Sequence, residues 1–332
     1  MTESYNKQLT ADTELVRRYG GPISHAALDP SCQRFRVPNI DGLICFLLTY
    51  RSAVVLGDPI CAPEHKAALA DAFAAHCADH RRSVVYAAVT AAMQTYARER
   101  SYGTMEFASL LIANPQCDPE AGHQGHHLRQ HLNHTRRMGV TVREYRGATA
   151  PDALLEAQTQ AACDQWLSAR QGPQMYLGRP RLFDDRSGRR WFIAEQAGLV
   201  VGMLSMLRVS YVDSGNLINI VFSAPTAPLY TNELLVVTAL QALREEGAGS
   251  VCLGIGPNAA LGQIDGCGSV TEFLSRHFYR LAANIMNLHG RTVFWEKYQI
   301  TRREPLYLLF QSPTIGFREI NALLRAFHLS MG

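Results

Sequence analysis

The sequence lacks any apolar segment long enough to cross a membrane as a helix. Its apolar runs fall short of the ~18–20 consecutive apolar residues that such a helix needs. The first 30 residues are polar and mixed in charge, which argues against a secretory signal peptide. These two absences predict a cytoplasmic protein without an integral membrane segment.

Closely spaced cysteine pairs are absent as well. The eight cysteines are scattered without a Cys-x-x-Cys pair, which predicts reduced core residues. His123, His127 and His131 recur every four residues, but no cysteine or acid completes a metal site at a suitable spacing. The net charge of +3 is too small to indicate a nucleic-acid partner by itself. The sequence therefore predicts neither a metal nor another cofactor.

A hairpin, a strand, a helix and a further strand follow one another in the second half of the chain. The apolar patterns predict strands over 192–196 and 199–209, a strand over 216–222, a helix over 231–246 and a strand over 250–255. Ala197-Gly198 between the first two strands is a short hairpin signal. This is the element order of the GNAT (acyl-CoA N-acyltransferase) core.

The turn before that predicted helix does not resemble a coenzyme A loop. Such a loop needs glycines, so that backbone N–H groups approach a pyrophosphate at the helix N-terminus. Residues 223–230 instead contain two prolines, which lack an N–H, and a tyrosine. The segment 244–249 spells a pyrophosphate-binding pattern, but it lies at a helix end, where glycine stops a helix. An acyl donor other than coenzyme A is predicted.

Two stretches of the 332 residues alternate between strand and helix patterns in a similar order, although no sequence repeat is visible. They predict an α/β fold of tandem GNAT-like domains, with mixed sheets flanked by helices. The expected division is a loose N-terminal arm with a short helix (1–39), a first domain (40–149), a linking helix and loop (150–184), a second, catalytic domain (185–310) and a C-terminal helix (311–332).

Several short motifs occur in an order and spacing typical of one enzyme family. They are Val54–Pro59, Leu128–Gly139, Trp166, Ala224–Pro228 with Glu233 after it, Leu253–Pro257 and Lys297-Tyr298. In these features the chain resembles the soluble catalytic domain of bacterial phosphatidylglycerol lysyltransferases, the multiple-peptide-resistance family, as a free-standing member. The resemblance implies transfer of an amino acid from aminoacyl-tRNA to a lipid or a small metabolite.

Charged positions of that family are replaced here. Its Asp-x-x-Arg pair falls on Asn219 and Phe222, and a late Lys-x-Lys falls on Trp295-Glu296-Lys297. The replacements favour a smaller or neutral aminoacyl group over lysine. They also favour an uncharged or apolar acceptor.

The candidate catalytic residues are Asn219, Glu233 and Lys297. An aminoacyl ester is already activated, so its transfer needs positioning, a path for a proton and stabilisation of an oxyanion. Lys297 would hold the terminal ribose or phosphate or stabilise the oxyanion. Glu233 would bind the donor's α-ammonium, and Asn219 would orient a carbonyl. A solvated lysine, an acid that complements a helix dipole and a core amide are the ordinary alternatives.

The candidate substrate-binding residues are Phe222, Tyr230, Asn232 and Trp295. Trp295 and Lys297 are expected on one face of a strand, because side chains alternate along a strand. Tyr230 would stack on the acceptor-end adenine of tRNA, or pack as an ordinary tyrosine.

Arginine predominates over residues 126–146, where Glu144 is the single acid. On a helix, positions 129 and 136 share a face with 133 close by. Such a face suits the phosphates of a tRNA acceptor stem, or is simply solvated. The candidate tRNA-binding residues are Arg129, Asn133, Arg136, Arg137 and Arg143.

Three functions stay open. The first is transfer from aminoacyl-tRNA to a hydroxyl or amino group of a small-molecule or lipid acceptor, in a specialised or natural-product pathway. The second is an acyl-CoA-dependent N-acyltransferase, and the third is a tRNA- or lipid-binding module without turnover. The C-terminal helix has apolar residues at 317, 320, 323, 324 and 327. It would pack on the core, form a homodimer or touch a membrane.

Overall fold

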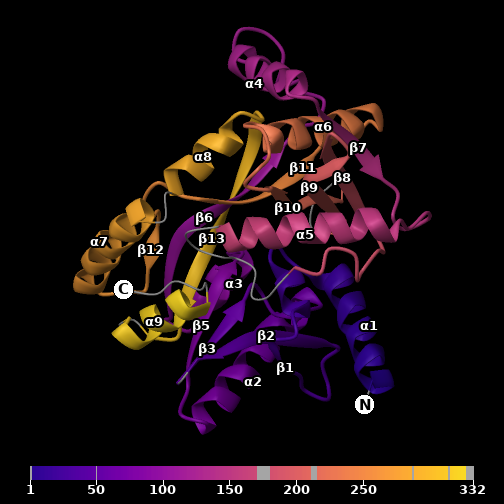
Figure 1. Ribbon diagram of the computed structural model, residues 1–332. Helices are drawn as coiled ribbons and strands as arrows, with labels where there is room; N and C mark the ends of the chain where they lie inside the picture. Colours follow the sequence, from indigo (N-terminus) through magenta and orange to yellow (C-terminus); the bar gives the residue numbers. More distant parts are fainter. Residues whose placement is uncertain are drawn as a thin grey trace.

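One mixed β-sheet with helices on its faces forms the protein (Figure 1). The computed structural model describes residues 2–49, 51–169, 180–210, 215–285, 288–312 and 315–326. Within these ranges thirteen strands join in the sheet. The prediction of an α/β fold with a mixed sheet flanked by helices is confirmed. No helix in this part of the chain is long and apolar enough to span a membrane.

The elements follow the alternation that the sequence predicts. The strands are β1 (Gln33–Phe35), β2 (Gly42–Thr49), β3 (Ser52–Leu56), β4 (Ile60–Cys61), β5 (Ser83–Val89), β6 (Gly103–Ala113), β7 (Val140–Tyr145), β8 (Arg189–Gln196), β9 (Leu199–Arg208), β10 (Asn216–Ser223), β11 (Val251–Pro257), β12 (Ile264–Asp265) and β13 (Ile300–Phe310). The α-helices are α1 (Thr2–Tyr19), α2 (Lys66–Asp79), α3 (Ala91–Glu99), α4 (His126–Arg137), α5 (Ala153–Ala169), α6 (Thr231–Glu245), α7 (Ser269–Ile285), α8 (Leu288–Glu296) and α9 (Phe317–Ala326). Two short 3-10 helices, η1 (Ser24–Leu28) and η2 (Pro63–His65), complete the set.

The strand order joins the two predicted domains in one sheet. The order is β1-β2-β3-β5-β13-β6-β11-β10-β9-β8-β7, with β4 on β2 and β12 on β6. Strand β7 pairs with β8, and β13 lies between β5 and β6. Each predicted domain therefore gives its last strand to the other. The sheet therefore continues across the predicted domain boundaries at residues 149 and 185.

Strands β10 and β11 diverge beside α6. They are parallel and paired at a single position, Leu217 with Cys252. Both strands are irregular just beyond it, β10 between Ile218 and Ile220 and β11 between Cys252 and Gly254. Since β10 leads into α6, the divergence opens toward the N-terminus of that helix. The predicted order of hairpin, strand, helix and strand is confirmed.

The expectation of a loose N-terminal arm is wrong. Helix α1 has 18 residues, and its Leu15 and Val16 are buried against the strands. Asp12 of this helix is 1 % exposed and pairs with Arg34 and Arg36, one in β1 and one just after it. A buried carboxylate needs such partners, so the arm is fixed to the sheet.

The C-terminal helix packs on the core, which was one of its three expected roles. Ala322 and Ala326 of α9 are 3 % exposed and lie in the same cluster as residues of β2 and β3. Position 327 lies outside the described residues. Six of the eight cysteines are buried, which agrees with the prediction of core residues. Burial raises the pKa of the Cys77 thiol to about 11.

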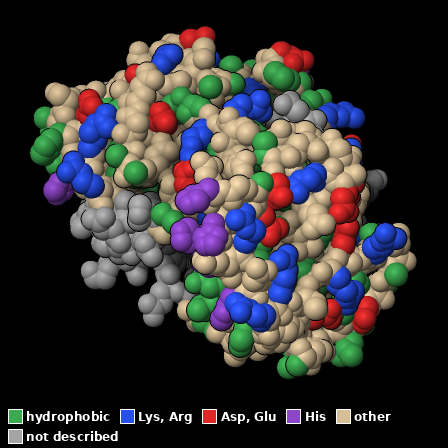
Figure 2. All heavy atoms as spheres, turned by 90° about the horizontal axis from the view of Figure 1, so that it is seen from above, with side chains coloured by type: hydrophobic (Ala, Val, Ile, Leu, Met, Phe, Trp, Pro, Cys, Tyr) green, Lys and Arg blue, Asp and Glu red, His purple; other side chains and the backbone are tan. Residues whose placement is uncertain are grey.

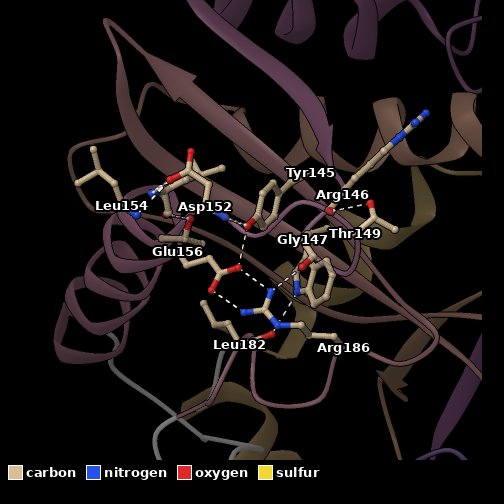
Figure 3. Close-up of polar contacts among 12 residues, drawn as sticks. Tyr145, Arg146, Gly147, Thr149, Asp152, Leu154, Glu156, Leu182 and Arg186 are labelled. Atoms are coloured by element: carbon tan, nitrogen blue, oxygen red, sulfur yellow. Dashed lines mark hydrogen bonds and ion pairs between the residues drawn. The ribbon is translucent and has the colours of Figure 1, made fainter.

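A polar cluster fixes the predicted linking helix α5 to the sheet (Figure 3). Arg186 donates two hydrogen bonds to the Glu156 carboxylate, at 2.6 and 2.7 Å. The Tyr145 hydroxyl of β7 donates to the same carboxylate at 2.7 Å. These hydrogen bonds, the one from Arg186 first, lower the pKa of Glu156. Helix α5 is thereby held across β9 and β10, so the open end of β10 lies on a rigid support.

Candidate active site

The turn between β10 and α6 is covered by helix α4. Tyr230 ends the turn with a left-handed φ of 67°. Its ring stacks on that of His131 in α4, with the ring centroids 3.7 Å apart and an angle of 2° between the ring planes. The Thr135 hydroxyl donates to the Leu229 carbonyl at 2.8 Å. A left-handed tyrosine is strained, so these contacts must hold it in place. In Figure 1, α4 lies above the start of α6.

Glu233 and Lys297 form an ion pair at this point. Glu233 is the third residue of α6 and is 7 % exposed, and Lys297 directly follows α8. Lys297 Nζ lies 2.8 Å from Glu233 Oε1, and His131 Nδ1 lies 4.0 Å from the same oxygen. The structure thus joins two of the three predicted catalytic residues. Both of these contacts are made to Oε1 of the carboxylate.

Three buried polar atoms without a partner belong to residues that contact this ion pair or adjoin it in sequence. They are His131 Nδ1, Asn232 Oδ1 and the Tyr298 hydroxyl, for which no hydrogen bond is recorded within the described residues. Buried polar atoms in folded proteins are generally hydrogen-bonded, so unpaired ones mark functional positions. Burial first, and the Glu233 charge second, raise the pKa of Tyr298 well above its ordinary value. Burial, then the Lys297 charge, lowers the pKa of His131.

Asn219 lies at the irregularity in β10 where this strand leaves β11. It is half-buried, on the strand that runs toward the start of α6. The position agrees with a role at the opening of the sheet. Its part in catalysis stays a prediction.

Two expectations for substrate-binding residues are wrong. Phe222 is 0 % exposed, and its ring packs on Trp166 of α5 at 5.5 Å, so it belongs to the core. Trp295 and Lys297 do not share a strand face, because 288–296 is a helix and Lys297 follows it. Trp295 packs on Phe294 and Tyr298 instead. Short apolar runs do not distinguish a strand from a buried helix, which explains the second error.

The predicted basic face divides into two sets. Asn133, Arg136 and Arg137 line an open hollow of about 500 Å³ on α4. Arg129 instead donates to the backbone carbonyl of Gly122 at 2.9 Å and to that of Glu120. The five predicted residues therefore do not form one surface.

Arg143 is the second predicted residue outside the hollow. It lies on β7 and pairs with Glu195 of β8 at 2.8 Å. Figure 2 shows the molecule from above, the side on which α4 lies in Figure 1. Histidine side chains gather there beside lysine and arginine side chains. The exposed members of this group on α4 are His126, His127, His134, Arg136 and Arg137.

Sequence reasoning missed two residues of the site, His131 and Tyr298. His131 appeared only in a histidine repeat, and Tyr298 only as a neighbour of Lys297. No local pattern could have placed them beside Glu233, because α4, α6 and α8 come from distant parts of the chain. Only their packing brings the three side chains together.

The glycine pattern at 244–249 stops a helix, as predicted. Gly247 has a φ of 75°, and the Ala248 N–H donates to the Leu243 carbonyl at 2.9 Å. Arg244 donates to the Pro115 carbonyl at 2.8 Å and so fixes the loop before α4. At the other end of α6, the carboxylate of Glu233 occupies the first turn. An acid there disfavours a pyrophosphate.

Comparison with known proteins agrees with the resemblance. The family described as "Phosphatidylglycerol lysyltransferase, C-terminal" matches residues 13–310. The chain belongs to this family. Membership in a lysyltransferase family implies an acyl- or aminoacyl-transferring enzyme. No curated protein sequence matches the chain.

Three solved structures share the fold. L-PGS from Bacillus licheniformis superposes with a TM-score of 0.77 at 17 % identity, over 96 % of this chain and 95 % of that one. The C-terminal domain of a lysylphosphatidylglycerol synthetase candidate from Agrobacterium fabrum superposes with a TM-score of 0.75 at 18 % identity, over 97 % of this chain and 96 % of that one. A Bacteroides thetaiotaomicron protein of unknown function superposes with a TM-score of 0.55 at 11 % identity, over 84 % of this chain and 85 % of that one. At these sequence identities the likeness shows the fold alone. The superposition covers most of this chain and most of each solved structure.

Proposed function

We propose that the protein transfers an aminoacyl group from aminoacyl-tRNA to a hydroxyl or amino group of a lipid or small-molecule acceptor. The observation that carries this proposal is the Glu233–Lys297 pair at the start of α6, in a chain of the lysyltransferase family. A carboxylate at that helix terminus suits a cationic group of the donor and repels the pyrophosphate of coenzyme A. An acyl-CoA donor is therefore disfavoured.

Glu233 and Asn232 would bind the α-ammonium of the aminoacyl group. The contacts with Lys297 and His131 use Oε1 of Glu233 and not Oε2, and Asn232 Oδ1 is a buried acceptor without a hydrogen bond in the described part of the chain. An ammonium group has three donors and no acceptor, so it needs acceptors such as these two oxygens. This is the role predicted for Glu233, now with Asn232 beside it.

Lys297 and His131 would serve the two halves of the reaction. The acceptor O–H or N–H attacks the ester carbonyl, and the developing oxyanion lies near the Lys297 ammonium. The acceptor's proton passes to neutral His131, whose lowered pKa keeps it unprotonated at neutral pH. Collapse of the tetrahedral intermediate breaks the ester bond, and the leaving ribose oxygen takes the proton.

The hollow on α4 would hold phosphates of the tRNA acceptor stem. Arg136 and Arg137 are exposed there, within two turns of His131 on the same helix. A donor end held at the hollow therefore lies close to the catalytic pair. Non-specific phosphate contacts of this kind weaken as salt concentration rises.

A small or neutral aminoacyl group fits the site better than lysine. Besides Glu233, the polar side chains of His131 and Tyr298 lie near Lys297, and neither is an acid. A second cation on the donor would meet Lys297 without a further acid. Phe222 lies in the core, so the preference for a small or neutral donor follows from the surroundings of Lys297 and from Asn219. The natural-product acceptor likewise stays a prediction beside the lipid.

The test is transfer of radiolabel from a mixed pool of aminoacyl-tRNAs to vesicles of phosphatidylglycerol and to a cell extract. Label in lipid or in a small product, abolished by ribonuclease pretreatment, supports the proposal, and single-amino-acid pools then name the donor. Labelled product from acetyl-coenzyme A that is insensitive to ribonuclease would overturn it. Productive transfer from lysyl-tRNA alone would overturn the choice of a small or neutral donor.

A further inference from the structure

Helix α7 carries an exposed apolar face. Val270 is 72 % exposed, Phe273 71 % and Leu274 59 %. Residues three and four apart lie on one face of a helix, so the three side chains form one stripe. Single exposed apolar residues are ordinary, whereas a stripe of three large ones on one helix marks an interaction surface.

The opposite face of α7 is fixed to the protein, which decides which way the stripe points. The Tyr279 hydroxyl lies 2.7 Å from the Phe107 carbonyl and 2.8 Å from the Asn258 carbonyl. Arg276 donates to the Leu261 carbonyl at 2.6 Å. Tyr279 lies roughly 120–180° around the helix from the three apolar residues, given 3.6 residues per turn. The stripe is therefore held outward.

Beside the apolar stripe, the exposed face of α7 carries basic side chains. His277 and Arg280 are exposed, one and two turns beyond the stripe. The acid of this helix, Glu272, is neutralised by Arg276 at 3.0 Å. At the left of Figure 2, where α7 lies in Figure 1, hydrophobic side chains lie beside lysine or arginine and histidine side chains. An anionic surface complements this charge.

We propose that α7 docks this protein on an anionic lipid bilayer. Phe273, Leu274 and Val270 enter the boundary between headgroups and acyl chains, while Arg280 binds lipid phosphates. An amphipathic helix with aromatic and aliphatic residues on one side and cations beside them lies in the interface in this way. The combination of inserted apolar groups with cations favours lipid over a protein partner. Docking requires neither a donor nor the transfer reaction, so it stands independently of the proposed function.

The docked face is connected to the candidate site. Helix α7 packs on α8, and α8 ends one residue before Lys297. Val293 of α8 is also 48 % exposed. Docking through α7 therefore brings the bilayer close to the elements that carry the catalytic lysine.

The experiment is sedimentation of the whole chain with vesicles of phosphatidylglycerol and phosphatidylcholine, and with vesicles of phosphatidylcholine alone. The unchanged protein should bind the anionic vesicles, and Phe273→Ser with Leu274→Ser should lower its partition about tenfold or more, given the apolar area withdrawn from the bilayer. Arg280→Gln should weaken binding mainly at low salt. Leu199→Ser is the matched control, since Leu199 is a 63 % exposed leucine on β9, and its partition should not change.

Three results would overturn the docking proposal. The first is no binding of the unchanged protein to anionic vesicles. The second is equal binding by the double variant and the control, with circular dichroism showing both folded. The third is loss of a dimer in gel filtration by the double variant without a change in vesicle binding, which would make the stripe an interface between two copies.

Discussion

Glu233 and Lys297 are 64 residues apart in sequence and form a 2.8 Å ion pair at the start of α6. The carboxylate is nearly buried, and the lysine side chain is 27 % exposed. A buried charge requires a partner, and this partner comes from the turn that follows α8. The pair therefore both stabilises the junction of α6 and α8 and presents an ammonium and a carboxylate at one place.

Glu233→Gln should reduce aminoacyl transfer about 100-fold in kcat/KM, because the donor ammonium loses its charged acceptor. The KM for aminoacyl-tRNA should rise more than kcat falls, since binding of the ammonium precedes the chemical step. Steady-state transfer assays measure both. Glu195→Gln, which removes the partner of Arg143 on the neighbouring strands, is the control and should leave transfer unchanged. An unchanged kcat/KM in Glu233→Gln would exclude this role for the carboxylate.

His131 should produce the acid limb of the pH–rate profile. Its pKa is lowered below the ordinary value of 6.5 by burial and by Lys297, so the neutral imidazole persists at neutral pH. Activity should fall as pH drops through this lowered pKa. His131→Gln should lose about 100-fold in kcat and lose that limb as well. His134→Gln, beside the same tyrosine, should keep the limb, and a limb that survives in His131→Gln would assign it to another group.

Arg136→Ala and Arg137→Ala should each weaken tRNA binding and lower its salt dependence. Each lost phosphate contact should reduce the slope of log affinity against log salt by about 0.7–0.9. Fluorescence titrations at several salt concentrations measure the slope. Arg181→Ala removes a 69 % exposed arginine side chain elsewhere and should leave the slope as it is. If the slope in Arg136→Ala and Arg137→Ala equals that of Arg181→Ala and of the unchanged protein, the tRNA binds outside the hollow.

Phe222→Ala should lower the free energy of unfolding by about 3–5 kcal/mol, because it opens a cavity against Trp166. Phe222→Leu should cost much less, as it keeps most of the volume. Denaturant unfolding measures both changes. If Phe222 contacted the substrate, the leucine variant would lose transfer activity while staying stable, and the assignment of Phe222 to the core would be wrong.

The sequence by itself determined the elements from β8 to β11 and their order. Alternating apolar runs, a hairpin signal and a glycine stop act over a few residues, so the strands β8 to β11 and helix α6 follow from local pattern. Local signals also led to Glu233 and Lys297, through their places at an element start and in a late motif. The family followed from the order of such motifs.

Only the tertiary structure decided which of these residues meet. The exchange of β7 and β13 between the two halves depends on pairs far apart in sequence, such as Val140 with Gln196 and Ile300 with Ala113, which no local pattern records. The same holds for His131 and Tyr298, which reach Glu233 through the packing of α4 and α8. For Phe222 the sequence left two roles open, because the pattern of an apolar residue on a strand is the same whether the side chain lines a site or fills the core. Its burial against α5 settled that choice.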